Sequence, residues 1–381
     1  MLVAADVADE PVAQPRRHRR RRRLSGRSVV EALGVLASPA VAFFVLRLRA
    51  MAPIVIPDPA MHTIYVVDPR DFFARYSQAL AATSGTREGA RVGFLVPARL
   101  AYLLFGGVDG FFVFRYVLAL VAVVPAYLLL RRLYGRWAGA IAVIVVMSSP
   151  VFVNAWGTDY PDAAVVSYLT GAIACLAMPC GDRRRPLWLA IAGALFTGAV
   201  WSLITAGPVV AAVLAVYAVV GLVRFRRRLW RDAAVLATSA LAVTGGLMVA
   251  SGLLLGPFDY LVATRRSFHY LDSAVVVAQY HSSNPRWVVL RPYLLVPAAA
   301  VGAYVVTFTK RLRDLDTAEL IVGLSCGASI AAFVFTPDIR RTLEALAPYQ
   351  PRLLRATVLR SGNSVLHAWL VALGRWARAG S

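Results

Sequence analysis

Long apolar runs that end in clusters of arginine constrain this chain more than any other feature of its sequence. Each run has about the 20 residues that a helix needs to cross the hydrocarbon core of a bilayer. Only helices and closed barrels satisfy their own backbone there, and these runs lack the alternation of strands. Because 59% of the residues are hydrophobic, more than in most soluble domains, we predict an all-α, polytopic transmembrane helical bundle.

The apolar runs are expected to give about nine membrane spans. Each run is bounded by charged or turn-forming residues, and the fifth and sixth are joined by a short turn. The expected spans cover residues 29–48, 109–130, 137–152, 163–178, 187–203, 207–223, 233–255, 292–308 and 317–335.

The distribution of arginine predicts the orientation of the spans. The net charge is +21, and short arginine-rich loops alternate with acidic or aromatic ones. Positive residues concentrate in short cytoplasmic loops, so the N-terminus is expected inside the cell, in a multi-pass protein of the inner (plasma) membrane. The arginine cluster at 16–23 is expected to bind anionic membrane lipids. This pattern argues against nucleic acid as a partner.

The same pattern divides the chain into three regions. Residues 1–27 are predicted to be a disordered basic cytoplasmic tail, and 28–335 the transmembrane domain, with outer loops at 51–107 and 256–291. The first span lacks a cleavage site and is expected to stay as a signal anchor. The basic tail at 336–381 is atypical, and we interpret it as an unusual outer tail or as a product of truncation or a changed reading frame.

The first outer loop carries two candidate carboxylates, Asp68 and Asp71. Pro69 favours an extended residue before it and can begin a helix, so Asp71 is expected in the first turn, where negative charge is stabilised. The apolar stretch at 91–106 contains Pro97 and Arg99 and is too short to span. We expect a helix lying in the outer interface.

Two further regions hold candidate polar residues. The second outer loop contains Asp159, Tyr160 and Asp162, and Asp162 has two interpretations, a functional carboxylate or the N-cap of the next span. The third outer region combines aromatic rings with arginines, which suit sugar rings and phosphate groups; an ordinary aromatic belt with a basic loop is the alternative. Its candidate substrate-binding residues are Arg265, Arg266, His269 and Arg291.

The order of these elements resembles the GT-C superfamily of polytopic glycosyltransferases, in particular the bacterial protein-mannosyltransferase and aminoarabinose-transferase branch. An early acidic motif, Asp68-Pro69-Arg70-Asp71, precedes a Pro97-containing helix that ends in Phe105-Gly106. Arg115 then lies in the second span, an arginine-rich inner loop follows at 131–135, and Ser149-Pro150 precedes Asp159 and Asp162.

This resemblance implies transfer of a sugar from a polyprenyl-phosphate donor to an acceptor hydroxyl at the outer face of the membrane, with inversion. The acceptor would be a glycan, a lipid or a protein. The general base would be Asp71, with Asp68 next, and Asp159 or Asp162 would orient the acceptor. Arg115, Tyr160 and the third-region residues would bind substrate. No cofactor is predicted, although some members of the superfamily use a divalent metal.

Two other functions compete with transfer. A transporter of lipid or solute would show repeat symmetry and facing charges within the membrane, and neither a repeat nor a pair of broken helices is found in the sequence. A non-catalytic membrane scaffold or degenerate homologue would not need to bring outer-loop carboxylates together. The chain also has fewer spans than most members of the superfamily. The three cysteines, Cys175, Cys180 and Cys326, show no metal-ligand spacing.

Overall fold

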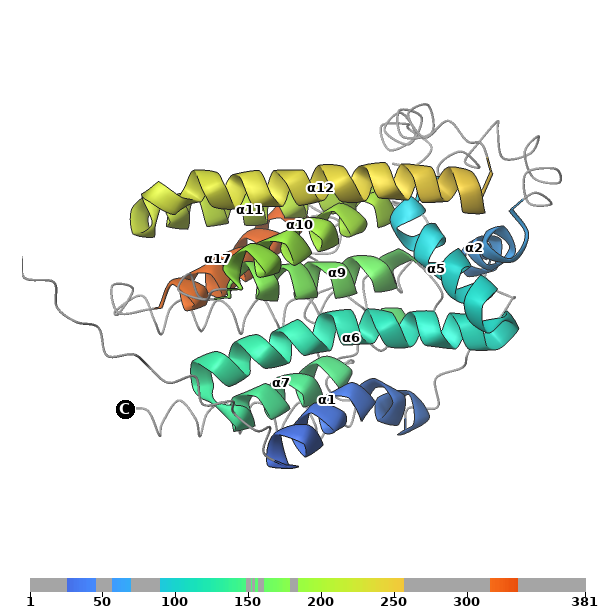
Figure 1. Ribbon diagram of the computed structural model, residues 1–381, viewed down its shortest axis with the longest axis horizontal. Coiled ribbons are helices and arrows are strands. Elements are labelled where there is room, and N and C mark those ends of the chain that lie inside the picture. The colour runs from blue at the N-terminus through green and yellow to red at the C-terminus, as the bar shows by residue number, and fades with distance from the viewer. Residues whose placement is uncertain are drawn as a thin grey trace, which may run out of the picture.

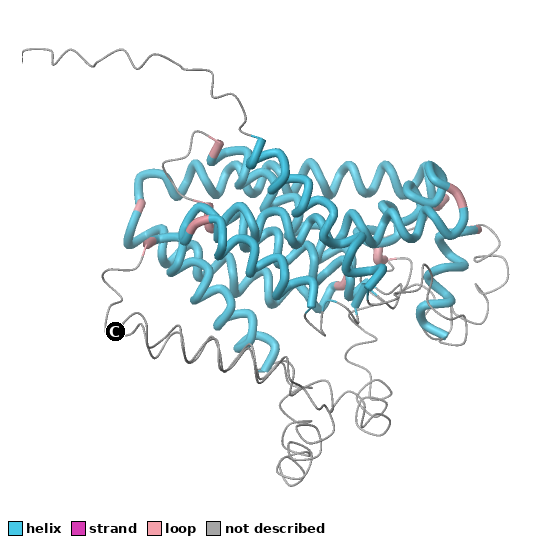
Figure 2. Tube along the Cα trace, turned by 90° about the horizontal axis from the view of Figure 1, so that it is seen from below, coloured by secondary structure: helices cyan, strands magenta, loops and turns pink. Residues whose placement is uncertain are grey.

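The computed structural model of the protein is a bundle of helices (Figure 1). It describes residues 26–45, 57–69, 90–148, 152, 155–156, 161–178, 184–256 and 316–334. Within these residues every regular element is a helix and no strand occurs, as the tube in Figure 2 also shows. The predicted all-α class is therefore confirmed.

Every predicted span except the eighth coincides with a helix to within a few residues. The eighth, at 292–308, lies outside the described residues, so the number of spans stays a prediction. The helices that match the spans are α1 (Gly26–Val45), α6 (Gly107–Tyr134), α7 (Arg136–Ser148), α9 (Pro161–Leu176), α10 (Arg185–Ser202), α11 (Gly207–Arg224), α12 (Arg226–Leu254) and α17 (Thr317–Val334).

A 3-10 turn, η1 (Ile204–Ala206), joins α10 to α11 at the predicted turn. The two remaining described helices come from the first outer loop. The loop helices are α2 (Pro57–Val67) and α5 (Val92–Phe105). Helix α12 begins seven residues before the expected span, because arginine is a good helix former and carries the helix through the basic segment.

Three helices are long and apolar enough to cross a membrane by length and composition: α6, α11 and the part of α12 at Arg228–Leu254. Helix α12 is the least buried of the three, and its exposed side chains include Leu241, Val249 and Leu253. The hydrocarbon core of a bilayer holds no water that could bond to the backbone, so a helix, which bonds its own backbone groups, suits that environment. Apolar side chains that are exposed on the surface of the bundle suit it as well. The described helices are those of a membrane protein.

Small residues let the central helices approach closely. A Cβ atom at Gly171 in α9 would lie 2.4 Å from the carbonyl oxygen of Val121 in α6. A Cβ atom at Gly93 in α5 would lie 2.3 Å from the carbonyl oxygen of Gly198 in α10. Neither contact is compatible with a larger residue, so α9 packs directly on α6, and α5 begins directly on the end of α10.

The helix α5 is inclined to its neighbours in Figure 1 and is buried over only part of its length. Its N-terminal residues from Val92 to Val96 lie in the core, whereas Leu103, Leu104 and Phe105 are exposed. The first half of α5 therefore belongs to the packed bundle. The exposed apolar second half is compatible with the predicted interfacial position, which stays a prediction.

The bundle has two ends of different chemistry. The "arginine end" contains Arg131, Arg136, Arg185 and Arg226, where α6 ends and α7, α10 and α12 begin. The "α2 end" contains α2, the start of α5 and the start of α9, and lies at the right of Figure 1. The short arginine-rich segments at 131–136, 184–185 and 224–231 thus meet at one end of the bundle, as the orientation argument requires.

Candidate functional site

Two polar side chains from the first outer loop meet in the core of the α2 end. His62 lies in α2, and Arg91 immediately precedes α5; the two side chains are 1% and 4% exposed. An Nη1–H of Arg91 donates a hydrogen bond of 2.7 Å to Nε2 of His62. Guanidinium groups have no acceptor, so Nε2 carries a lone pair and the ring proton is on Nδ1.

A carboxylate, Asp162, shares this environment. It lies in the first turn of α9, immediately before the apolar run of that helix, and is partly buried. Burial raises the pKa of Asp162, whereas the positive charge of Arg91 lowers it, and burial has the larger effect. The helix N-terminus also favours negative charge here. We call His62, Arg91 and Asp162 the "site cluster".

The Asp162 carboxylate is influenced by its neighbours without being bonded to them. No hydrogen bond or direct ion pair joins it to another described residue, although the charge of Arg91 acts on it. A carboxylate that is coupled to a cation while its oxygen atoms remain available can take a proton from a ligand or orient a hydroxyl group.

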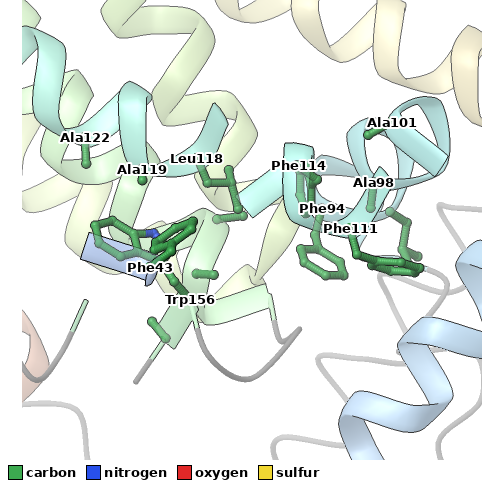
Figure 3. Packing of buried hydrophobic residues seen from close by; sticks show 14 of the residues in the cluster. Phe43, Phe94, Ala98, Ala101, Phe111, Phe114, Leu118, Ala119, Ala122 and Trp156 are labelled. Carbon is green, nitrogen blue, oxygen red and sulfur yellow. The ribbon is translucent and has the colours of Figure 1, made fainter. Parts of the chain in front are cut away.

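Aromatic rings line one side of the site cluster. The ring of Phe94 stands edge-on to His62 with centroids 5.9 Å apart, and Phe114 of α6 packs on Phe94 at 5.3 Å. Figure 3 shows Phe94, Phe111 and Phe114 gathered at this place between α5 and α6. The guanidinium and imidazole groups are almost fully buried, and charge interactions are stronger where water is excluded.

The structure places three of the ten residues predicted for the site. Asp162 is in the site cluster. Asp68 is exposed and follows the last residue of α2, and Arg115 is buried within α6, where it is 3% exposed. Among the described residues, neither forms a hydrogen bond or ion pair with Asp162. The others lie outside the described residues: Asp71, Asp159, Tyr160, Arg265, Arg266, His269 and Arg291.

The sequence argument did not single out His62 or Arg91. His62 is a lone imidazole in an otherwise apolar helix, and Arg91 stands at the start of an apolar stretch that looked interfacial. A signal was present, because a polar residue in an apolar helix must find a partner when it is buried. The sequence gives no means of pairing residues 29 positions apart.

A metal site would need several His, Cys, Asp or Glu side chains close together. Within the described ranges no group of three or more His, Cys, Asp and Glu side chains lies close enough together to hold a metal ion. The site cluster supplies one carboxylate and one imidazole, and the imidazole already accepts from Arg91. The sequence argument predicted no cofactor, with a divalent metal as the alternative that the family resemblance allows, and both interpretations stand as before.

A second buried polar cluster lies at the arginine end. Arg185 donates hydrogen bonds to the carbonyl oxygens of Leu176 (2.8 Å) and Met178 and to the hydroxyl of Tyr217 (2.7 Å). Tyr217 in turn donates to Asp232, whose Oδ2 is 3.5 Å from Nη2 of Arg185. We call Arg185, Tyr217 and Asp232 the "lock cluster", because together they join the end of α9 to α10, α11 and α12.

Comparison with known proteins bears on the function of the bundle. The model of the dolichyl-phosphate-mannose-protein mannosyltransferase family matches residues 92–251, which is less than half of the chain. The resemblance to the GT-C superfamily is confirmed over these residues. The match to this GT-C family begins one residue after Arg91 and includes Asp162 and the whole lock cluster.

Solved structures also resemble the GT-C-like bundle. Crystal structures of ArnT from Cupriavidus metallidurans match in the form bound to undecaprenyl phosphate, at 19% identity and a TM-score of 0.48, and in the apo state, at 16% and 0.41. The matches cover 89% and 90% of this chain, which spans only 63% of the length of ArnT in each case. No protein of curated function matches the sequence.

Proposed function

We propose that the protein is a membrane glycosyltransferase that moves a sugar from a polyprenyl-phosphate donor to an acceptor hydroxyl. The observation that carries this proposal is the site cluster: an available carboxylate beside a buried arginine, at the end of the bundle away from the basic loops. The family of protein mannosyltransferases that matches residues 92–251 supports the same reaction class, as does a neighbour that holds undecaprenyl phosphate.

The chemistry requires a base and a positive charge in one place. The acceptor oxygen forms a bond to the anomeric carbon while the bond from that carbon to the phosphate oxygen breaks, with inversion. The hydroxyl proton passes to a carboxylate, and the electron pair leaves with the lipid phosphate. In this proposal Arg91 neutralises the charge that develops on the phosphate, and Asp162 orients the acceptor.

The remaining roles follow from the sequence argument. Asp71 is proposed as the general base, with Asp68 as the alternative, since both follow α2 and its His62 along the chain. Asp159 would assist Asp162. Substrate contacts are proposed for Arg115 within α6 and for residues outside the described ranges: Tyr160, Arg265, Arg266, His269 and Arg291.

The proposed site faces the outside of the cytoplasmic membrane. Basic loops prefer the cytoplasm, and those of this chain meet at the arginine end. The α2 end would then face outward, with the N-terminus of the protein inside the cell. A lipid-linked donor cannot leave the bilayer, so the reacting groups must lie where its headgroup lies, near the ends of the helices.

Binding of the lipid phosphate tests the proposal directly. The full chain would be placed in lipid nanodiscs, and binding of undecaprenyl phosphate would be compared with that of undecaprenol, which lacks the phosphate. We expect Arg91→Gln to weaken binding of undecaprenyl phosphate by about tenfold and to leave undecaprenol unaffected. Arg224→Gln, at an exposed position of the arginine end, is the matched control.

The alternative functions give different results. A scaffold would bind the phosphate and the alcohol equally, and that result would refute the transferase. A transporter would bind the phosphate but would not release it from a sugar. Incubation with undecaprenyl-phosphate-linked hexoses and pentoses, with free undecaprenyl phosphate as the measured product, separates transport from transfer.

A further inference from the structure

We propose that Arg99 is a positioning residue that holds α2 against α5 and thereby keeps His62 in contact with Arg91. Arg99 lies eight residues after Arg91, on the same stretch of chain. Its Nη1 donates hydrogen bonds of 2.8 Å to the carbonyl oxygen of Val66 and 2.6 Å to that of Val67. The inference rests on the proposed function only in treating the site cluster as the donor site.

The carbonyl groups that Arg99 contacts need an external donor. They belong to the last turn of α2, where carbonyl oxygens have no partner within the helix. The helix ends there because Pro69 has no N–H to continue the bonding, and the last backbone bond runs from Asp68 to Ile64. A guanidinium group at this place also opposes the partial negative charge of the helix C-terminus.

The conformation of Arg99 is fixed from the side of α5. Its guanidinium carbon lies over the Tyr102 ring, 5.5 Å from the centroid and about one turn further along the helix, so the cation is attracted to the face of the ring. The two fixed hydrogen bonds then determine where α2 ends relative to α5. Lysine could donate to one of the carbonyls but has no planar group to lie over the ring.

Arg91 and Arg99 therefore hold α2 at two points. Arg91 contacts His62, and Arg99 contacts the carbonyls four and five residues further on, about one helical turn away. A helix fixed at one point can rotate about it, whereas two contacts define its register. Release of Arg99 leaves this turn of α2 held only by the apolar packing of Tyr65 and Val66, so that His62 shifts relative to Arg91 and the chain leading to Asp68 is displaced.

The experiment uses the imidazole nitrogen signals of His62 in the full chain, with ¹⁵N-labelled histidine and assignment by His62→Gln. Arg99→Gln should shift the Nε2 signal of His62 toward that of a solvated imidazole, and Arg99→Lys should return it toward the parent position. Binding of undecaprenyl phosphate should fall about tenfold in Arg99→Gln. A residue that only stabilises the fold would not move the His62 signal.

Two controls keep the proposal testable. Arg224→Gln should leave the His62 signal unchanged, since this residue is exposed at the arginine end. If Arg99→Gln does not fold, Tyr102→Leu removes the ring that Arg99 lies over and should produce a smaller shift in the same direction.

An unchanged His62 signal in Arg99→Gln, or in Tyr102→Leu if only that variant folds, would overturn the positioning role. A shifted His62 signal in a protein whose parent does not bind undecaprenyl phosphate would support the positioning of α2 and reject the proposed donor. The two ideas can therefore fail separately.

Discussion

The two buried polar clusters of this protein contain similar groups but use them differently. In the lock cluster, the Asp232 carboxylate accepts from Tyr217 and faces Arg185, whose Nη1 donates to carbonyl oxygens at and just after the end of α9. In the site cluster, the charge of Arg91 acts on the Asp162 carboxylate, but this carboxylate is bonded to no described residue. The first arrangement pairs its carboxylate with a hydroxyl group and a cation, and the second keeps its carboxylate available.

The length of α9 separates the two clusters. Asp162 lies in its first turn, and the carbonyl of Leu176 that Arg185 contacts lies at its last residue. Fourteen residues of helix correspond to about 21 Å. A rigid helix fixed at the arginine end can hold a carboxylate at the α2 end, which is how a protein can combine a stable interior with an incompletely bonded site. The following changes test this comparison.

The largest effect is expected when the lock cluster loses its cation. Arg185→Met should destabilise the protein by about 3–5 kcal/mol, because Asp232 would remain buried without a counter-charge and the α9 carbonyls without a donor. The measurement is the free energy of unfolding in detergent, with Arg184→Met at the neighbouring exposed position as the control.

A double variant sharpens that result. Combining Arg185→Met with Asp232→Leu removes both charges, so more than half of the lost stability should return. If the double variant is as unstable as the single one, the destabilisation comes from the lost caps on α9 rather than from the unpaired carboxylate.

Loss of the site carboxylate should affect activity instead of stability. Asp162→Asn keeps the size of the side chain and removes a charge that burial disfavours, so stability should stay within about 1 kcal/mol of the parent or rise. Release of undecaprenyl phosphate from a sugar donor should fall about 100-fold. A large loss of stability would mean that Asp162 is part of a structural network like the lock cluster.

The pH dependence of stability offers a third comparison. Because burial raises the pKa of Asp162, the folded protein binds this proton more tightly than the unfolded chain does. The stability that protonation provides is present at acid pH and is lost as pH rises through the raised pKa. Arg91→Gln removes a charge that lowers this pKa, so the loss should move to higher pH.

Thermal unfolding across the acid range measures this shift, and Asp162→Asn is the control because it abolishes the titrating group. An Arg91→Gln profile that coincides with the parent profile would show that Arg91 does not act on Asp162.

The smallest effect is expected for a neutral hydrogen bond that joins α9 to a residue preceding it in the chain. Trp156 is 1% exposed and donates from Nε1 to the hydroxyl of Ser167, 3.1 Å away. Ser167→Ala should cost about 1 kcal/mol, because an indole N–H is left without its acceptor. This cost gives the loss of stability for an uncharged buried hydrogen bond, against which the losses in the two charged clusters can be compared. A cost that matched Arg185→Met would mean that α9 responds equally to any buried polar change.

The sequence by itself determined the helices. Apolar length and flanking arginine give nearly every described span to within a few residues, because crossing a bilayer and satisfying the backbone leave few alternatives. The same reasoning predicted that the basic loops lie on one side of the membrane. It also identified Asp162, because a carboxylate at the start of an apolar helix is conspicuous without knowledge of its neighbours.

Only the tertiary structure decided which groups meet. Arg91 and His62 are 29 residues apart, and Arg185 and Asp232 are 47 apart, so no local periodicity relates them. Asp68, chosen from the sequence, is exposed, whereas His62, six residues earlier, is buried against an arginine. Burial depends on how α2 packs on α5, and that packing follows from the carbonyl contacts of Arg99 and the aromatic contacts of Phe94, which involve partners distant in the chain.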